Sequence, residues 1–201
     1  MPPASTPSRA PALAPGERRQ ALIEATLRAI LELRTSPSTR QIAAAAGVAE
    51  GTIFRVFDTK EELIDAAIAQ AFDPEPFAEQ VAAIDPDLTL RPRLEALVAA
   101  VQDRFREVFD VMAALGLTSP PDEHPNASQT QVRDITQRLT DVIRPDAEAL
   151  RVTPEEVLKY ARLLTFSGSH PELTDENPLT PAEITSVLLD GLLIEPGVTG
   201  C

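Results

Sequence analysis

Residues 38–60 read STRQIAAAAGVAEGTIFRVFDTK. This stretch predicts two short helices joined by a tight turn, because Ser38 is a good N-cap and Gly47 permits the left-handed backbone that ends a helix. The alanines between these two residues let the helices cross closely. We therefore expect a helix-turn-helix, whose second helix, over residues 50–57, leaves its outer face free for the major groove of DNA.

The side chains of this stretch divide into an inner and an outer set. The apolar set that we expect to fill a small core is Ile42, Val48, Ile53 and Phe57. The set that we expect to point outward is Glu50, Gly51, Thr52 and Arg55. The same pattern also suits an ordinary corner of a helical bundle that binds no DNA, and this alternative stays open on geometry alone.

Helical periodicity continues on both sides of the motif. Residues 16–36 carry an amphipathic stripe, and Asp58-Thr59 with Glu61-Glu62 is capping chemistry for a helix that runs to Phe72. The sequence Asp73-Pro74-Glu75-Pro76 then interrupts the period. Further proline-free, helically periodic windows cover residues 77–84, 93–116, 127–143, 154–167 and 181–194.

The fold class that these windows predict is all-α, since no segment alternates with a period of two for long. We expect a Pro-rich, unstructured leader over residues 1–15, a three-helix helix-turn-helix head over 16–72, and a larger helical domain over 73–201. We expect the larger domain to sense a ligand and to form a dimer.

Charge supports two regions with different roles. Residues 1–60 hold eight Lys and Arg against five Asp and Glu, whereas the remaining 141 residues hold ten against 26. Binding to phosphate needs local positive potential, so DNA is a suitable partner for the first region only. The acidic region is expected to face away from DNA.

Other classes of protein find little support in the sequence. The single cysteine, Cys201, excludes an internal disulfide or a zinc cluster, and no apolar run is long enough to span a membrane, so we expect a cytoplasmic protein. We expect no cofactor and no catalytic site, because no phosphate loop or nucleophile-histidine arrangement is visible. Asp122, Glu123 and His124 form a Pro-rich loop, and we expect these residues and His170 to be solvated rather than to bind a metal.

A family resemblance strengthens the DNA-binding hypothesis. The sequence Ile42-Ala43, Ala46-Gly47-Val48, Gly51-Thr52-Ile53-Phe54, Phe57 and Lys60-Glu61-Glu62-Leu63 resembles the DNA-binding region of TetR-type transcriptional repressors, over about residues 17–72. The chain departs from that pattern at Phe54, where a tyrosine is usual, at Val56, where a polar ring is frequent, and near Arg34, where a glycine commonly closes the first helix. The resemblance implies contacts to double-stranded DNA from Thr39, Arg40, Gln41, Glu50, Gly51, Thr52, Phe54, Arg55 and Lys60.

The acidic domain is expected to hold a small-molecule effector, as the resemblance also implies. The residues that we expect to line its pocket are Leu97, Val101, Phe105, Val108, Phe109, Met112, Leu139 and Ile143. Ordinary core packing is the alternative for each of them.

The last two helices are suited to a partner helix pair in a second copy of the chain. The residues that we expect at this homodimer interface are Leu158, Ala161, Thr165, Gly168, Ile184, Val187, Leu188 and Gly191. A purely intramolecular pair is the alternative. The function that follows is a one-component repressor that binds a palindromic operator as a homodimer and is released by a small apolar or amphipathic ligand. The competing hypotheses are a helical ligand-binding or enzymatic protein without specific DNA binding, and a regulator without an inducer.

Overall fold

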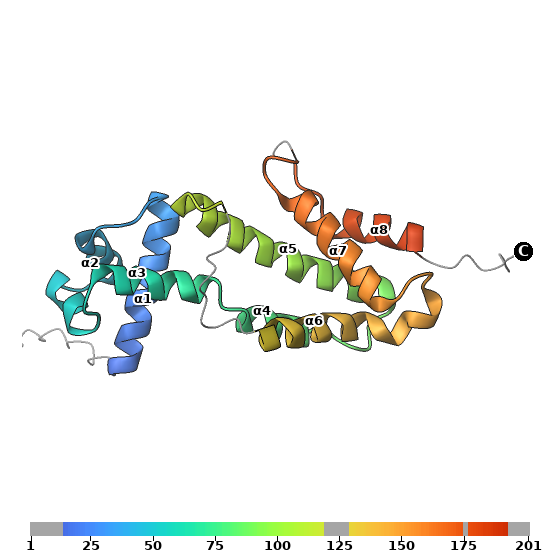
Figure 1. Cartoon of the computed structure of the whole chain (residues 1–201), viewed down its shortest axis with the longest axis horizontal. Helices are drawn as coiled ribbons and strands as arrows, with labels where there is room; N and C mark the ends of the chain where they lie inside the picture. The colour runs from blue at the N-terminus through green and yellow to red at the C-terminus, as the bar shows by residue number, and fades with distance from the viewer. Residues whose placement is uncertain (1–13, 119–128, 175–176, 193–201) are drawn as a thin grey trace, which may run out of the picture. The chain divides into compact units, whose positions relative to one another are not determined.

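The computed structural model describes residues 14–118, 129–174 and 177–192. Within these ranges the chain forms helices and no β-strand, which confirms the all-α class (Figure 1). The chain divides into two compact units, Met1–Gln70 and Ala71–Cys201, which are treated separately below. The expected leader lies almost wholly outside the described residues.

The N-terminal unit contains the elements α1 (Pro15–Leu33), α2 (Thr39–Ala46), the 3₁₀ helix η1 (Glu50–Arg55) and most of α3 (Lys60–Ala71). α1 ends three residues before the expected limit, because Arg34 takes the left-handed conformation with φ 51° and ψ 39°. Its backbone N–H donates to the carbonyl of Ile30 at 2.9 Å. An arginine thus performs the C-cap role for which the resemblance implied a glycine.

The head is held together by a small core shared among its helices. Its fully buried large side chains are Leu22, Ile30, Ile42, Ile53, Phe57 and Leu63. The guanidinium carbon of Arg19 lies 4.7 Å from the centre of the Phe57 ring, so a cation covers the one large aromatic of this core. Three of the four predicted core residues, Ile42, Ile53 and Phe57, are buried as expected, while Val48 is half-buried.

The turn between α2 and η1 has the geometry that the sequence predicts. The hydroxyl of Ser38 accepts from the Gln41 N–H at 3.3 Å, and the Gln41 side chain accepts from the Ser38 N–H at 2.8 Å, which completes a capping box. Gly47 ends α2 at φ 66° and ψ 32°, and the Val48 N–H returns to the Ala43 carbonyl at 3.0 Å.

The second element of the motif is shorter and tighter than the expected helix over residues 50–57. It forms i to i+3 hydrogen bonds, such as Thr52 N–H to the Ala49 carbonyl at 2.8 Å and Val56 N–H to the Ile53 carbonyl at 2.9 Å. α3 begins as expected, because the Thr59 hydroxyl accepts from the Glu62 N–H at 3.0 Å and the Glu62 carboxylate accepts from the Asp58 N–H at 2.9 Å.

The C-terminal unit is a helical bundle. Its elements are α4 (Glu75–Ala82), α5 (Leu90–Leu115), α6 (Gln129–Ile143), the 3₁₀ helix η2 (Arg144–Ala149), α7 (Pro154–Ser169) and α8 (Pro181–Leu192). α5 begins three residues before its expected start because Pro92 lies in the first turn, where a missing N–H costs nothing. The short helix η2, not expected from the sequence, follows α6 directly.

A buried guanidinium joins four segments of this bundle. Arg93, only 6% exposed, donates to the carbonyl of Val142 at 2.8 Å, to that of Pro86 at 3.0 Å and to that of Leu88 at 2.8 Å. It also forms an ion pair with Asp146 in η2. The charge is therefore paired and its donors are used, which is the condition for burying an arginine at acceptable cost.

We expect Gly47→Ala to lower the free energy of unfolding of the chain by about 1 kcal/mol, because a Cβ is strained in the left-handed region. Gly51→Ala is the matched control, since it lies in open space without a positive φ and is expected to be neutral or slightly stabilising. Urea unfolding followed by circular dichroism measures both. Equal effects of the two substitutions would contradict the assignment of the turn.

Arg93→Met is expected to lower the free energy of unfolding by about 3 kcal/mol, because it leaves the Asp146 carboxylate and buried carbonyls without a partner. Arg91→Met is the control: Arg91 is exposed and lies 3.5 Å from Asp190, so its loss is expected to cost no more than about 0.5 kcal/mol. Chemical denaturation of the purified variants distinguishes the two, and a similar loss in both would refute the role given to Arg93.

Candidate nucleic-acid interface

The nine residues predicted to contact DNA all have solvent-accessible side chains or, for Gly51, an accessible backbone. Those that are exposed are Arg40, Gln41, Glu50, Gly51, Phe54 and Arg55, and those that are half-buried are Thr39, Thr52 and Lys60. They come from α2, η1 and the first residue of α3. The outer face of the motif is therefore a polar surface of this head.

Two arginines on this face have unpaired guanidinium groups. Arg40 and Arg55 are exposed, and neither guanidinium has an ion pair or hydrogen bond with any residue that the structure describes. A guanidinium in this state can donate two parallel hydrogen bonds to O6 and N7 of guanine or bind a phosphate. Arg40 lies in the first turn of α2 and Arg55 at the end of η1, so the two cations belong to the two elements of the motif.

The other polar residues of the face have partners within the head. The Thr39 hydroxyl forms a hydrogen bond with the carboxylate of Glu50, which ties α2 to η1. The side-chain carbonyl of Gln41 is used in the capping box with Ser38, so its amide nitrogen is the part that can still donate. Sequence reasoning placed both residues at the interface but did not foresee these partners.

Phe54 gives the face an apolar element. Its side chain is 52% exposed, one residue before the end of η1. A phenyl ring cannot donate a hydrogen bond to phosphate, in contrast to the tyrosine that is usual in the TetR-type pattern. What it can contact is the methyl group of thymine or the sugar edge.

Comparisons with known proteins agree with this geometry. A helix-turn-helix that presents unpaired arginines on an open face is typical of one class of protein, the DNA-binding transcriptional regulators. Residues 36–67 match the family model described as "Bacterial regulatory proteins, tetR family". The match covers the helix-turn-helix, so the DNA-binding segment of the chain is similar to that of tetR-family transcriptional regulators.

The fold of the whole chain resembles those of several solved TetR-family regulators. One from Streptomyces coelicolor has a TM-score of 0.58 at 20% identity, over 89% of this chain and 80% of that one. SCO0520, also from Streptomyces coelicolor, gives 0.55 at 22% identity over 89% and 99%. NalD of Pseudomonas aeruginosa, the secondary repressor of the MexAB-OprM multidrug efflux pump, gives 0.53 at 22% over 90% and 100%. At these identities the likeness is one of fold.

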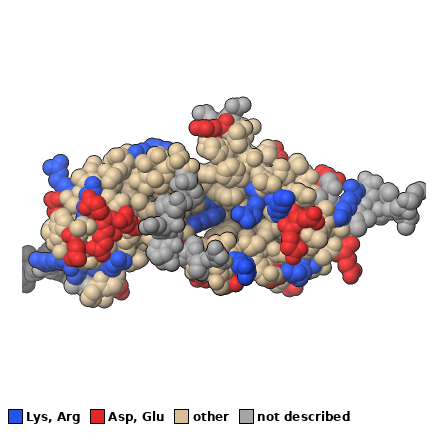
Figure 2. Space-filling view, viewed as in Figure 1, with Lys and Arg blue, Asp and Glu red and all other residues tan. Residues whose placement is uncertain are grey.

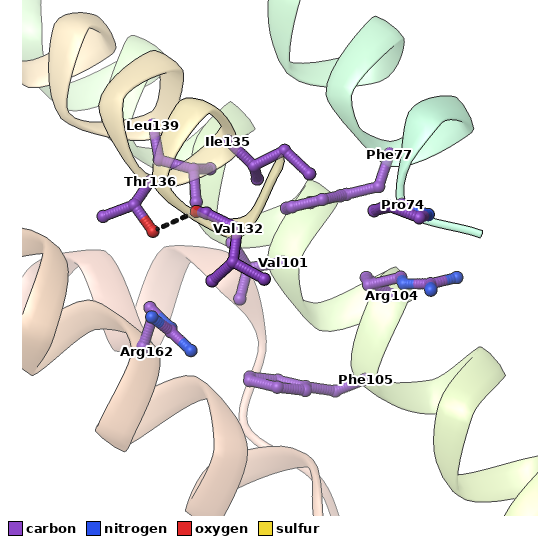
Figure 3. Close-up of a pocket in the computed structure, with 10 residues that line it drawn as sticks. All are labelled: Pro74, Phe77, Val101, Arg104, Phe105, Val132, Ile135, Thr136, Leu139 and Arg162. Atoms are coloured by element: carbon purple, nitrogen blue, oxygen red, sulfur yellow. Dashed lines mark hydrogen bonds between the residues drawn. The ribbon is translucent and has the colours of Figure 1, made fainter. Parts of the chain in front are cut away.

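The C-terminal unit contains a cavity of about 190 Å³ between α5, α6, α7 and the start of α4 (Figure 3). Its lining residues are Pro74, Phe77, Val101, Arg104, Phe105, Val132, Ile135, Thr136, Leu139 and Arg162. Of the eight expected pocket residues, Val101, Phe105 and Leu139 line it. Leu97 and Ile143 lie instead in the fully buried core, while Val108, Phe109 and Met112 are half-buried on α5 away from the lining.

Sequence reasoning missed the contributions of Phe77, Ile135 and the two arginines to this cavity. Phe77 and Ile135 lie in windows that were correctly predicted as helices, but periodicity does not show which helices face one another. Arg104 and Arg162 are polar positions of amphipathic helices, which are ordinarily assigned to solvent. Figure 3 shows them on opposite sides of the cavity, with Val101 and Phe105 between them.

The two arginines have different surroundings. Arg104 is partly buried, donates to the Ala71 carbonyl at 3.0 Å and lies 3.6 Å from a carboxylate oxygen of Glu107. Burial lowers the pKa of its guanidinium from the ordinary value, while the charges of Glu107 and Asp73 oppose that shift. Arg162 is exposed and pairs with no residue in ranges 14–118, 129–174 and 177–192.

Phe109 belongs to an aromatic cluster beside the cavity. Its ring centre lies 5.9 Å from that of Phe105, 5.3 Å from that of Phe166 and 5.0 Å from that of His170. The expectation of a solvated His170 was wrong, because the ring is half-buried against these aromatics. The loop with Asp122, Glu123 and His124 lies outside the described residues.

The expected dimer residues pack largely within the chain. Those buried by their own subunit are Leu158, Ala161, Thr165, Gly168, Ile184 and Leu188. At Gly168, for example, Leu179 of the same chain leaves little room for a side chain: a Cβ built there would lie 3.0 Å from the Leu179 Cδ1 atom. Val187 is 61% exposed, and the surroundings of Gly191 are outside what the structure describes. The intramolecular alternative thus accounts for most of this set.

Two searches of the described residues were negative. No helix among them is long and apolar enough to cross a membrane. No group of three or more His, Cys, Asp and Glu within the described ranges is arranged to hold a metal ion.

We expect Glu50→Gln to tighten binding to duplex DNA about fivefold, because it removes one negative charge, worth about 1 kcal/mol at ~4 Å in water, from the face that we expect to meet phosphates. The amide oxygen can still accept from Thr39, so the link between α2 and η1 is kept. Fluorescence anisotropy with a labelled duplex measures the affinity. Glu148→Gln, an exposed acid of η2, is the matched control and should leave it unchanged. Weaker binding after Glu50→Gln would contradict this prediction and indicate that the carboxylate accepts from a cytosine amino group.

Proposed function

We propose that this protein is a one-component repressor that binds a palindromic operator as a homodimer and is released by a small ligand. The observation that carries the proposal is the pair of exposed, unpaired arginines, Arg40 and Arg55, on the two elements of a tetR-family helix-turn-helix. Arg40, Arg55, Gly51 and Thr52 approach base edges, and Thr39, Thr52 and Lys60 contact phosphates. Phe54, Gln41 and Glu50 complete the surface.

Recognition combines two kinds of contact, one that supplies affinity and one that supplies specificity. Contacts to phosphate supply much of the affinity and fall with salt, whereas a bidentate arginine on guanine discriminates by about 1–3 kcal/mol. Because Phe54 replaces a hydroxyl donor, fewer phosphate contacts are expected from η1. We propose that the protein is cytoplasmic, because a regulator must be in the same compartment as the DNA that it binds.

The homodimer is supported by large apolar side chains that the single chain leaves exposed on its last helices. Leu163 on α7 is 58% exposed and Val187 on α8 is 61% exposed, and Tyr160 lies on the same helix as Leu163. A second copy would remove these side chains from water. A twofold dimer presents two heads to half-sites about 34–36 Å apart, which is why we expect the operator to be a palindrome.

Ligand release is supported by the position of the cavity along α5. Val101, Arg104 and Phe105 of this helix line the cavity, and the same Arg104 donates to the carbonyl of Ala71, the last residue of α3. A ligand that displaces α5 therefore acts directly on the end of the helix that begins at Lys60. A coupling free energy of about 1–3 kcal/mol is enough for regulation.

Selection of bound sequences from a random duplex pool tests this proposal. We expect the full chain to enrich a palindrome, and Arg55→Ala to relax the selection at one base pair in each half-site. Arg133→Ala, an exposed arginine of α6, is the matched control and should enrich the same palindrome as the parent. The selection is run at two salt concentrations, since a phosphate-only contact weakens binding without changing the sequence that is chosen.

The outcomes separate the competing hypotheses. Enrichment of a non-palindromic site would contradict the homodimer. No enrichment, or binding that depends on salt but not on Arg55, would refute specific repression and make the C-terminal unit the functional part of the chain.

A further inference from the structure

The cavity of the C-terminal unit has a positively charged lining, although the region of the chain around it is acidic. Residues 61–201 contain 26 Asp and Glu against ten Lys and Arg, yet the charged residues that line the cavity are two arginines and no acid. On the face seen in Figure 2, Lys and Arg side chains gather beside a hollow of this unit. A cationic lining within an acidic domain favours an anionic ligand over a neutral or cationic one.

Most of the polar groups at the cavity are already engaged. The Thr136 hydroxyl donates to the Val132 carbonyl at 2.8 Å, as the dashed line in Figure 3 shows. Arg104 is held by the Ala71 carbonyl and by Glu107. Neither side chain is free to form a new charged pair without losing an existing contact.

Arg162 is the exception. It projects from α7 on the side of the cavity opposite Arg104 (Figure 3), and it has no partner among the described residues. A planar guanidinium pairs with a carboxylate through two parallel hydrogen bonds, which also orients the acid. The single unpaired guanidinium of Arg162 therefore suits a ligand that carries one negative charge.

The rest of the lining fits an apolar body. Phe77 and Phe105 contribute rings, and Val101, Ile135 and Leu139 contribute aliphatic surface. The volume of about 190 Å³ is of the size that holds one aromatic ring, since an apolar cavity of about 150 Å³ accepts benzene. A neighbouring hollow of about 580 Å³ shares Phe105, Thr136 and Arg162 with the cavity, so a chain can extend past the arginine.

We propose that the cavity binds an apolar monocarboxylate, a single-ring or medium-chain acid, with its carboxylate on Arg162 and its apolar body between Phe77 and Phe105. This inference rests on the proposed function, because it specifies the chemical class of the effector. It assigns different roles to the two arginines: Arg162 binds the acid, and Arg104 keeps its contact with the end of α3.

Calorimetric titration of the full chain with octanoate and 3-phenylpropionate, in the absence of DNA, tests the proposal. Octanamide and 3-phenylpropionamide are the neutral isosteres. At least one acid is expected to bind, with its amide about tenfold weaker or more, because the amide cannot form the charge-assisted pair. No binding of either acid, or equal binding of acid and amide, would overturn the proposal.

Variants locate the carboxylate. Arg162→Gln is expected to weaken the acid about tenfold and to leave the amide unchanged, and Arg162→Lys is expected to recover part of the loss. Arg133→Gln, also an exposed arginine but on α6 outside the lining, is the control and should bind as the parent does. Thermal unfolding without ligand verifies that each variant is folded. Unchanged affinity for the acid in Arg162→Gln would refute the assignment of Arg162.

The two proposals can fail independently. Acid binding is measured without DNA, and operator selection is measured without acid. If the acid binds but no operator is selected, the ligand class stands and specific repression fails. If an operator is selected but the acid does not bind, the reverse holds.

Discussion

The buried guanidinium of Arg93 fixes the C-terminal unit at the place where four of its segments meet. It satisfies carbonyls from the loop before α5 and from the end of α6, and it neutralises Asp146 of η2. These contacts set the position of α5 relative to α6, and the cavity lies further along the same two helices. The shape of the cavity therefore depends on an ion pair outside its lining, because a buried charge cannot be left unpaired without a large loss of free energy.

The head has a different kind of constraint, which is conformational. Two residues, Arg34 and Gly47, take left-handed backbone and end α1 and α2, so that the chain can reverse twice within a few residues. The capping box of Ser38 and Gln41 and the hydrogen bond between Thr39 and Glu50 then hold the two elements of the motif together. None of these contacts involves Arg40 or Arg55, so both guanidinium groups stay exposed and unpaired among the described residues.

How much the sequence predicted differs between the two units. In the head, a local pattern carries the information: cap, glycine, alanines and apolar spacing lie within 23 residues. The turn after α2, the exposed face and three of the four core residues agree with the expectation, whereas η1 is shorter than the expected helix. In the C-terminal unit the helices were predicted, but the faces through which they pack against one another were not. Leu97 and Ile143 are core residues instead of pocket residues, and Leu158, Thr165 and Leu188 pack inside the chain instead of at an outer surface.

The sequence by itself determined the helical class, the helix-turn-helix and the outward position of its arginines, because each depends on contacts between residues close together in the chain. Only the tertiary structure decided which helices enclose the cavity and that its charged lining is cationic. Arg162 illustrates the reason: on α7 alone it is one more polar residue of an amphipathic helix, and it becomes part of a site because α5 and α6 bring apolar surface beside it. Such long-range packing is not encoded in the period of any one helix.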